Sequence, residues 1–424
     1  MKSFLLLCCL LGNLAVLHGQ TDTYTLVIEG YDWGAGVSQI ILPYPAEAEV
    51  PTPDAFFVSV ERAGSCGPLP PAQASGTLLV LRTYRSDEVG GPSSAGSHVT
   101  LNTFVAPFEP MTAPMQYFFN NECRGNVWLD YRLDITESGT DRRWNREGRR
   151  EYPLVDQFDL TGTYTHPDST RLTYAHFTPA QRASGPRPLL IWLHGGGEGG
   201  TDPTVALLAN RAANYASPEL QHHFDGAHVL VPQTPTFWMD RGDGEYTRGE
   251  VDDRYYPALL GLIDRFVAAH PDVDPRRIYL GGCSNGGYMT LKLLFERPKF
   301  FAAAYPSALA MYSEFVTDEQ LRSIRKVPIW FVHSADDTTT PPDKTVVPLV
   351  RRLRELGAKD IHFSYYEHVV DLTRLYGGED FHYPGHLSWI YSHTNQCYRD
   401  DDGEPVRVKG RPVTLLEWMA AQRR

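Results

Sequence analysis

The sequence lacks an excess of basic residues. Its 39 Lys and Arg residues are outnumbered by 51 Asp and Glu residues, and the formal net charge at pH 7 is −12. Binding to nucleic acid depends on Lys and Arg side chains that neutralise phosphate groups. The composition therefore argues against a nucleic-acid partner.

Long apolar runs are also scarce. One lies at residues 4–17, after Lys2, and it is shorter than the roughly 20 apolar residues that span a bilayer. A basic start followed by a short apolar core is typical of a secretory signal peptide, here residues 1–20, with cleavage near Gly19 or Gln20. We expect a secreted or periplasmic protein with no membrane span in its mature chain. An uncleaved anchor is the alternative.

Three motifs that bind common ligands are missing. The sequence contains no G-x-x-x-x-G-K-[ST] phosphate loop and no His and Cys spacing of the kind that holds zinc. The acidic stretch YRDDDGE at residues 398–404 lacks the spacing of a calcium-binding EF-hand loop, so it indicates a solvated turn. We expect neither a metal nor another cofactor.

Cysteine is sparse as well. Two of the six cysteines belong to the predicted signal peptide. An oxidising compartment allows disulfides, and the four remaining cysteines permit three pairings. Their positions in the chain favour the pairs Cys66–Cys123 and Cys283–Cys397. Four buried thiols are an equally supported alternative.

The mature chain begins with short β-type runs. Within residues 21–137, runs rich in Val, Ile, Thr, Tyr and Phe alternate with Gly, Pro and Ser, and no helical period interrupts them. This spacing favours a small all-β sandwich domain. The polar segment at residues 138–154 has no apolar period and is predicted to be a linker.

The pattern changes from about Val155, and residues 155–424 alternate between strands and helices. PLLIWLHGGG, HVLVPQTP, RRIYLGG, VPIWFVHSADD and IHFSYYE have the character of strands, whereas RYYPALLGLIDRFVAAH, YMTLKLLFE and TVVPLVRRLRELG have helical spacing. Such alternation predicts an α/β fold, with a mostly parallel sheet and helices on both faces.

One serine carries a chemical signal. GGCSNGG at residues 281–287 follows a predicted strand and precedes a predicted helix, and it fits the G-x-S-x-G pattern around Ser284. In a nucleophile elbow the turn is so tight that the flanking glycines must lack side chains, and the serine hydroxyl is held above the helix N-terminus. Ser284 is therefore the candidate nucleophile.

A serine nucleophile needs a base, and in this fold the chain order is Ser, then Asp or Glu, then His. Asp336 and Asp337 follow the apolar strand VPIWFV, and His386 lies in the glycine-containing loop YPGHLSWIY. His386 would take the serine proton, and the aspartate would orient the imidazole. The alternatives near these positions are Asp371, His368, His382 and His393.

The stretch LHGGGEGG is predicted to leave a strand and to present bare backbone amides. The N–H groups of Gly196, Gly197 and Asn285 would stabilise an oxyanion, and Gly195 is not separable from the first two. The loop FWMDRGDGEY places Trp238 as a candidate wall of the substrate pocket.

The motifs LHGGGEGG, GGCSNGGYMT, VHSADDTTTP and GHLSWIY together resemble those of secreted α/β-hydrolases. The resemblance covers residues 153–424. It is to the branch that contains esterases, polyhydroxybutyrate-depolymerase-like enzymes and prolyl-oligopeptidase-like enzymes. It implies the α/β-hydrolase fold. In related enzymes the acid follows H-G-x-x-D-x-x-x-P, and His333 and Pro341 bracket that pattern here, which selects Asp337 over Asp336.

Ser334 stands where that pattern has glycine, which leaves the register of the acid unchanged. Residues 21–137 are similar to the immunoglobulin-like domain that precedes some such esterases, on the stretch TLVIEGYDWGAGVSQIILPY. That domain offers a surface through which the protein would oligomerise.

Three functions follow from this resemblance. The first is a carboxylesterase that acts through an acyl-serine intermediate on small or polymer-linked esters, including aryl esters. The second is a peptidase of the prolyl-oligopeptidase type, although those enzymes usually carry a propeller and the β-region here is short for one. The third is a non-catalytic binding protein on a hydrolase scaffold, against which the intact Ser, Asp and His weigh.

Overall fold

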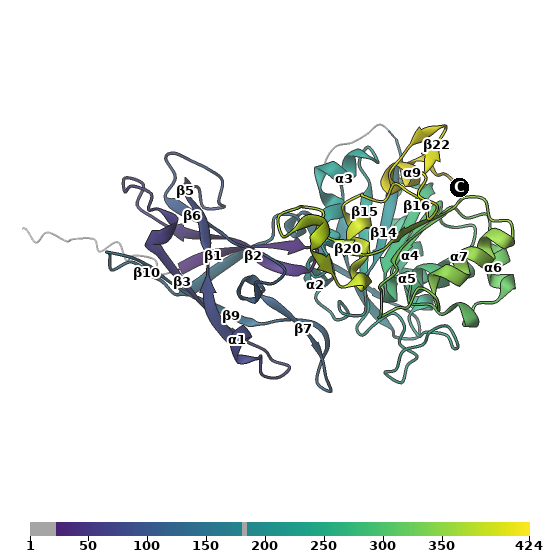
Figure 1. Ribbon diagram of the computed structural model, residues 1–424, viewed down its shortest axis with the longest axis horizontal. Helices are drawn as coiled ribbons and strands as arrows, with labels where there is room; N and C mark the ends of the chain where they lie inside the picture. Colours follow the sequence, from purple (N-terminus) through teal and green to yellow (C-terminus); the bar gives the residue numbers. More distant parts are fainter. Residues whose placement is uncertain (1–22, 180–184) are drawn as a thin grey trace, which may run out of the picture.

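The computed structural model describes residues 23–179 and 185–424. The predicted signal peptide, residues 1–20, lies outside the described residues. The described chain forms a β-rich N-terminal region and an α/β C-terminal region, which lie side by side along the long axis of the molecule (Figure 1). Within the described part, no helix is long and apolar enough to cross a bilayer.

The N-terminal region is a sandwich of two sheets. The five-stranded sheet has the order β11-β1-β2-β6-β5, and the four-stranded sheet has the order β10-β9-β3-β4. Buried and exposed residues alternate along strands such as β3, which gives each sheet an apolar inner face. The strands are β1 (Thr23–Tyr31), β2 (Gly34–Pro43), β3 (Phe56–Ala63), β4 (Ser75–Leu78), β5 (Val80–Ser86), β6 (His98–Thr103), β9 (Asp130–Glu137), β10 (Arg143–Trp144) and β11 (Arg146–Glu151), with the short helix α1 (Pro71–Ala74) before β4.

The structure extends the sandwich beyond the predicted boundary. The segment predicted as a linker, residues 138–154, contains β10, which pairs with β9, and β11, which pairs with β1 in parallel. Eight of the 17 residues of this segment therefore belong to the two sheets, because backbone hydrogen bonds to β1 and β9 order a stretch whose side chains are mostly polar. Within the predicted β-type region, the run at residues 77–84 forms two strands that are divided at Leu79, where the chain passes from one sheet to the other.

A separate hairpin projects from the sandwich. Strands β7 (Met115–Phe119) and β8 (Arg124–Trp128) pair only with each other among the described strands, and the ribbon shows β7 extending toward the C-terminal region (Figure 1). The turn between them contains Cys123, which is disulfide-bonded to Cys66. The hairpin tip is thus covalently fixed to the loop that follows β3.

The C-terminal region is built on one eight-stranded sheet with the order β12-β13-β15-β14-β16-β17-β18-β19. The first two pairings at the β12 edge are antiparallel, and the other five are parallel. The fold is therefore the predicted α/β fold with a mostly parallel sheet. Its strands are β12 (Phe158–Thr165), β13 (Arg171–Phe177), β14 (Arg187–Leu193), β15 (His228–Gln233), β16 (Val273–Cys283), β17 (Ala303–Ser307), β18 (Ile329–Ser334) and β19 (Ile361–Tyr366).

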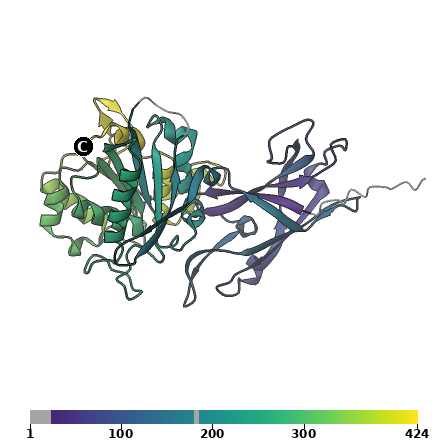
Figure 2. The ribbon, with the colours of Figure 1, turned by 180° about the vertical axis from the view of Figure 1, so that it is seen from behind.

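Both faces of this sheet are covered by helices (Figure 2). Along β14, Leu189, Ile191 and Leu193 face one apolar cluster, whereas Leu190 and Trp192 face the other, because successive side chains of a strand point to opposite faces. The first cluster includes α4 (Tyr256–Ala269), α5 (Asn285–Glu296), α6 (Asp318–Ile324) and α7 (Val346–Glu355). The second includes α2 (Pro203–Leu208), α3 (Pro218–His222), α8 (Trp389–His393) and α9 (Leu415–Ala421).

Short strand pairs and direct contacts complete the arrangement. The pairs are β20 (Val369–Val370) with β21 (His382–Tyr383), and β22 (Arg407–Val408) with β23 (Arg411–Pro412). Between the two regions, Arg211 Nη1 donates to Asp32 Oδ1 at 3.0 Å, and Trp128 Nε1 donates to Asp202 Oδ2 at 2.9 Å. These contacts fix the sandwich beside the loops at the carboxyl edge of the large sheet.

Candidate active site

Ser284 lies at the sharp turn between strand β16 and helix α5. Its backbone has φ 53° and ψ −110°, a positive-φ conformation that few residues other than glycine adopt. A Cβ at Gly282 would lie 2.5 Å from the carbonyl oxygen of Gly286, and one at Gly286 would overlap the carbonyl of Leu193. Both glycines of the G-x-S-x-G pattern are therefore required by the close packing of strand on helix.

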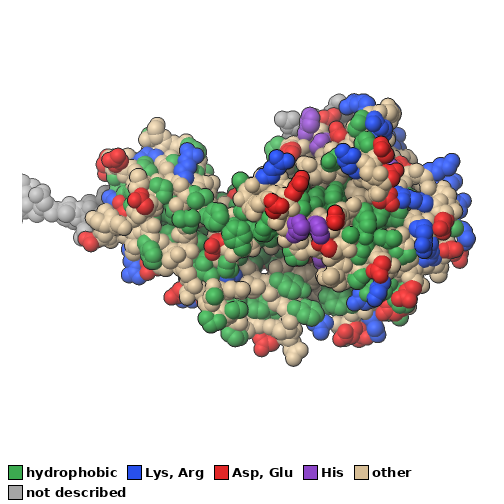
Figure 3. Space-filling view, viewed as in Figure 1, with side chains coloured by type: hydrophobic (Ala, Val, Ile, Leu, Met, Phe, Trp, Pro, Cys, Tyr) green, Lys and Arg blue, Asp and Glu red, His purple; other side chains and the backbone are tan. Residues whose placement is uncertain are grey.

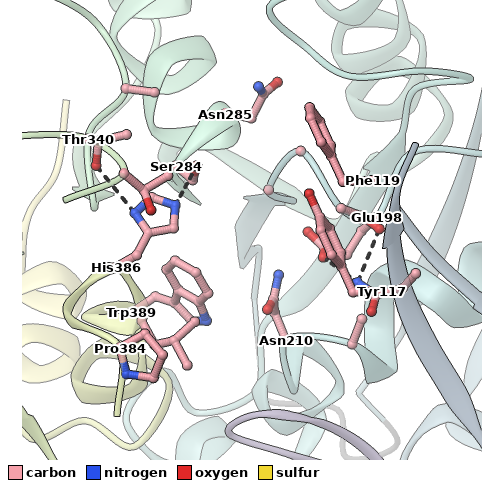
Figure 4. Close-up of a pocket in the computed structure, with 18 of the residues that line it drawn as sticks. Tyr117, Phe119, Glu198, Asn210, Ser284, Asn285, Thr340, Pro384, His386 and Trp389 are labelled. Atoms are coloured by element: carbon pink, nitrogen blue, oxygen red, sulfur yellow. Dashed lines mark hydrogen bonds between the residues drawn. The ribbon is translucent and has the colours of Figure 1, made fainter. Parts of the chain in front are cut away.

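The structure brings the three predicted side chains together. His386, in a single 3₁₀ turn at Gly385–Leu387, has its Nε2 2.9 Å from Ser284 Oγ and its Nδ1 2.9 Å from Asp337 Oδ2. Because an ionised carboxylate can only accept, Nδ1 carries the proton, and Nε2 accepts a hydrogen bond from the Ser284 hydroxyl. Figure 4 shows the imidazole aimed at the serine. This arrangement can take a proton from Ser284 and pass it on.

Asp337 is held as an anion. Burial of the carboxyl group acts to raise its pKa, but hydrogen bonds from His333 and His386 outweigh burial, and the pKa lies well below its usual range. The hydroxyl of Thr340 also donates to Oδ2 at 2.8 Å, and the backbone N–H groups of Thr339 and Thr340 donate to Oδ1 at 2.9 Å. The carboxylate is therefore fully hydrogen-bonded and fixed in orientation.

The alternative carboxylates point elsewhere. Asp336 accepts from His368 Nδ1 at 2.9 Å and from Ser334 Oγ at 2.8 Å. Asp371 accepts backbone N–H groups of the loop that follows it, from Thr373, Tyr376 and Gly378. Neither has a hydrogen bond to His386, which leaves Asp337 as the partner of the imidazole.

The alternative histidines have other surroundings. His393 is buried against the rings of Trp192 and Tyr215, and burial lowers its pKa to about 3. His382 and His368 stack on each other with ring centroids 4.2 Å apart. These side chains belong to the core and to the surface beside the site.

Backbone amides line the site opposite the imidazole. Gly196, Gly197 and Asn285, the three predicted oxyanion residues, all line the cleft. Asn285 is the first residue of α5, so its N–H has no partner within the helix. Gly195 differs from the other glycines, because its backbone N–H is directed at the buried carboxyl group of Glu198. That contact separates Gly195 from Gly196 and Gly197, which the sequence alone did not do.

The site opens into a cleft between the two regions. The cavity measures about 550 Å³, and Figure 3 shows a hollow between the two regions with hydrophobic side chains on both sides of it. Ser284 and His386 lie on one side, and Tyr117 and Phe119 of the hairpin lie on the other (Figure 4). The remaining aromatic side chains of the lining are Trp33, Tyr246 and Trp389.

The prediction that Trp238 forms a wall of the pocket is wrong. Trp238 is fully buried, with its ring centroid 5.1 Å from that of His194, and it lies in the core beneath the loop. Its neighbour Met239 lines the cleft instead. The backbone N–H of Met239 donates to Asn285 Oδ1 at 2.9 Å, and this bond sets which side of the loop faces the cleft.

One of the two predicted disulfides is absent. Cys66 and Cys123 are bonded, as predicted, but Cys283 and Cys397 are free, buried thiols. Cys283 ends strand β16 and has its Sγ 3.9 Å from Asn210 Nδ2. Cys397 follows helix α8, and its thiol faces the hydroxyls of Tyr366 and Ser364.

Several residues of the site were not predicted from the sequence. Tyr117, Phe119 and Asn126 come from the hairpin, and nothing in their local pattern distinguishes them from other strand residues. Thr340 had a weak signal, because it lies within the H-G-x-x-D-x-x-x-P pattern. Glu198 lies inside LHGGGEGG and its charge in a glycine loop is the signal that could have identified it.

The described residues contain no group of three or more His, Cys, Asp or Glu side chains placed to hold a metal ion. The fold and the site together define a protein class: an α/β-hydrolase fold with an immunoglobulin-like β-sandwich in front of it.

Comparisons with known proteins agree with this class. Residues 23–146 match the model of the esterase Ig-like N-terminal domain, and residues 236–321 match that of the prolyl oligopeptidase family. A crystal structure of a thermostable esterase superposes with a TM-score of 0.73 over 95% of this chain and 100% of its own, at 22% sequence identity. This likeness covers both regions and establishes the shared fold.

Two curated proteins are similar in sequence over part of the chain. A "Probable carboxylesterase SOBER1-like" of Arabidopsis thaliana is 24% identical over 178 residues, which is 37% of this chain and 63% of that protein. The "Poly(3-hydroxyalkanoate) depolymerase C" of Paucimonas lemoignei is 29% identical over 133 residues, which is 30% of this chain and 28% of that protein. The chain thus spans less than two thirds of either relative.

Proposed function

We propose that this protein is a serine hydrolase that cleaves carboxylic esters through an acyl-serine intermediate. The observation that carries the proposal is the continuous hydrogen bonding from Ser284 through His386 to Asp337 in a cleft. Similarity to a carboxylesterase, to a polyester depolymerase and to an esterase fold supports the same chemistry.

In the first step, Ser284 Oγ attacks the ester carbonyl carbon while its proton passes to His386 Nε2. Asp337 stabilises the imidazolium that forms, because its carboxylate accepts from Nδ1 at 2.9 Å. The carbonyl oxygen becomes an oxyanion, which the N–H groups of Gly196 or Gly197 and of Asn285 would hold. The position of Asn285 at the N-terminus of α5 adds the favourable end of the helix dipole.

In the second step, the tetrahedral intermediate collapses. His386 Nε2 gives its proton to the leaving alcohol oxygen, and the acyl group stays on Ser284. Water then attacks the acyl carbon with His386 as the base, and a second collapse releases the carboxylic acid and restores the serine hydroxyl.

The cleft indicates the size and character of the substrate. A cavity of about 550 Å³ with five aromatic side chains suits a small acyl group joined to an aryl or apolar alcohol. We therefore place short-chain and aryl esters, free or attached to a polymer, as the substrate class.

We also propose export and a two-domain organisation. The Cys66–Cys123 disulfide supports an oxidising compartment, which agrees with the predicted signal peptide at residues 1–20. The last strand of the sandwich, β11, ends at Glu151, and the first strand of the large sheet, β12, begins at Phe158, so the boundary between the domains would fall between them.

A second candidate function is peptide hydrolysis, because residues 236–321 match the prolyl oligopeptidase family. The same triad would serve. A p-nitrophenyl acetate assay beside an X-Pro anilide separates the two activities: faster turnover of the ester supports the esterase, and faster turnover of the anilide supports the peptidase.

The test of the mechanism is Ser284→Ala. We expect ester hydrolysis to fall by about 10⁴-fold or more, to the residual rate that binding and the oxyanion groups sustain. A fluorophosphonate probe should label the wild type at Ser284 and leave the variant unlabelled, with both proteins showing the same Tm. Ester turnover that survives the substitution would exclude Ser284 as the nucleophile.

A further inference from the structure

Glu198 is a buried acid that the proposed mechanism does not use. It follows directly after Gly195–Gly197, and its side chain is only 4% exposed although it lines the cleft. A carboxyl group in such a place loses its hydration and is costly to keep unless several donors surround it. Glu198 lies on the side of the cleft that carries Tyr117 and Phe119, across from Ser284 and His386 (Figure 4).

On one side, Glu198 contacts the N-terminal region. Its Oε1 accepts from Asn126 Nδ2 at 3.0 Å, and Asn126 belongs to strand β8 of the hairpin. Asn126 also holds the glycine loop at residues 195–197, because its backbone N–H and its Nδ2 donate to the carbonyl oxygen of Gly197 at 2.7 and 3.1 Å. Strand β8 lies so close to the glycine loop that a Cβ at Gly125 would be 2.8 Å from the carbonyl oxygen of Gly197.

On the other side, Glu198 contacts the glycine loop and helix α2's C-terminal end. The backbone N–H of Gly195 and the side-chain amide of Asn210 are both directed at its carboxyl group. A Cβ at Gly195 would lie 2.9 Å from Oε2, which shows how near the loop passes. The carboxyl group thus lies between the hairpin and the backbone that would hold the oxyanion.

We propose that Glu198 is a positioning residue: as a carboxylate it fixes the glycine loop in the geometry that receives the oxyanion and joins that loop to hairpin β7–β8 through Asn126. The inference rests on the proposed esterase function. It needs the ionised form, because Asn126 Nδ2, which donates to Oε1, could not donate to a protonated oxygen or to an amide nitrogen in that place. The Gly195 N–H and the Asn210 amide are also directed at the carboxyl group, but neither makes a hydrogen bond of normal geometry to Oε2.

The protonation state of Glu198 should consequently control turnover. Burial raises its pKa to about 7, although the hydrogen bond from Asn126 and the nearby N–H groups of Gly195 and Asn210 act to lower it. The titratable groups that interact with it are the Cys283 thiol of β16 and the phenols of Tyr117 and Tyr246. All three are neutral near pH 7, so the carboxylate takes up its proton as the pH falls through about 7, and activity is lost on the acid side.

The main experiment is Glu198→Gln, which keeps the shape and removes the charge. We expect kcat for p-nitrophenyl acetate, per active site titrated with a fluorophosphonate, to fall by about 10- to 100-fold while KM changes little, because the effect lies in the transition state. In the wild type the fall of kcat in acid should include a step near pH 7 from protonation of Glu198, and this step should be absent from the profile of the variant. Glu245→Gln, an exposed acid in the loop between β15 and α4, is the matched control and should behave as the wild type.

A second variant tests the link to the hairpin. Asn126→Asp places a carboxylate where Nδ2 lies 3.0 Å from Glu198, and like charges at this distance favour the protonated form. The acid limb of the pH profile should move to higher pH in Asn126→Asp. The shift should be absent in the double variant Asn126→Asp/Glu198→Gln, which has no second carboxylate to repel.

The outcomes separate the inference from the proposed function. A Glu198→Gln variant with wild-type turnover per titrated site, or one that loses only Tm and keeps the pH profile of the wild type, overturns the positioning role and leaves the esterase intact. A wild type that neither hydrolyses esters nor reacts with the fluorophosphonate overturns both. If the wild type reacts with the probe but hydrolyses no ester tested, the labelling rate replaces kcat, and the same fall in Glu198→Gln supports the inference.

Discussion

The two regions of this molecule contribute different things to one cleft. The α/β region holds every group that the proposed reaction uses, in the turns and loops that follow its strands. The sandwich supplies Tyr117, Phe119 and Trp33 as wall and Asn126 as a brace on the glycine loop. The reacting groups therefore come from one region alone. The walls of the cleft and the contacts that position the glycine loop come from both regions.

This difference predicts which substitutions should change kcat and which should change the recognition of particular esters. Changes among the reacting groups should lower kcat for every ester. Changes in the hairpin should depend on the substrate, because its aromatic side chains touch only what extends across the cleft.

The largest effect should come from the α/β region, at Asp337. In Asp337→Asn the amide nitrogen would face His386 Nδ1, which favours the imidazole tautomer with its proton on Nε2, so that Nε2 cannot accept from Ser284. We expect kcat/KM for p-nitrophenyl acetate to fall by about 10⁴-fold with the fold unchanged by circular dichroism. Asp336→Asn is the matched control, since that carboxylate binds His368, and it should retain activity near that of the wild type.

The next test removes the Cys66–Cys123 disulfide, which lies in the sandwich region. Cys66→Ala/Cys123→Ala frees the hairpin tip and should lower the free energy of unfolding by about 2–4 kcal/mol in urea. The KM for aryl esters should rise as well, because the wall becomes less ordered. Mild reduction of the wild type should reproduce both changes, and an unchanged unfolding midpoint would contradict the structural role.

The hairpin side chains test recognition alone. Phe119→Ala should raise KM for aryl esters by about 10-fold, the loss of roughly 1.4 kcal/mol of apolar contact, and should leave acetate esters of small alcohols nearly unaffected. Phe57→Ala removes an exposed phenylalanine of β3 that does not line the cleft, and it should have no effect on either substrate. A general fall in kcat for Phe119→Ala would show that the division between the regions is wrong.

The last test concerns stability in acid, where the effect at any pH near neutrality is small. His393 is buried in the α/β region, where burial lowers its pKa to about 3. Below the unfolded value of about 6.5 the unfolded chain binds the proton first, so the folded state loses up to about 1.4 kcal/mol for each pH unit from this group as pH falls from 6.5 toward 3. His393→Leu should give a shallower dependence of unfolding free energy on pH, and a dependence parallel to that of the wild type would contradict the assignment.

The sequence predicted the features that local chemistry determines. The strand, turn and helix around Ser284 are encoded within a few residues, because Gly282 and Gly286 are required by packing at that turn. Asp337 and His386 were then found from the chain order Ser, Asp, His that this fold uses, with Asp337 just after an apolar strand and His386 in a glycine-containing loop. Strand β17 was missed, because AAYPS contains alanines and a proline and lacks the usual strand composition.

The sequence could not predict features that depend on distant contacts. Whether Trp238 or Met239 faces the cleft is decided by His194 and by Asn285, which come from other elements. Whether Cys283 could bond to Cys397 depended on how far apart the fold places the end of β16 and the segment after α8. The role of Asn126 arises only when a hairpin of the sandwich meets a loop some 70 residues further along the chain.

Strand β1 has a practical consequence. It begins at Thr23, at the end of the sandwich remote from the large sheet, and runs toward the cleft, where the turn after it carries Trp33 (Figure 1). Nine residues of extended chain span about 30 Å. If the protein is immobilised on a bead through an attachment at Thr23, its cleft should therefore face away from the support. Bulky or insoluble substrates should still reach the cleft.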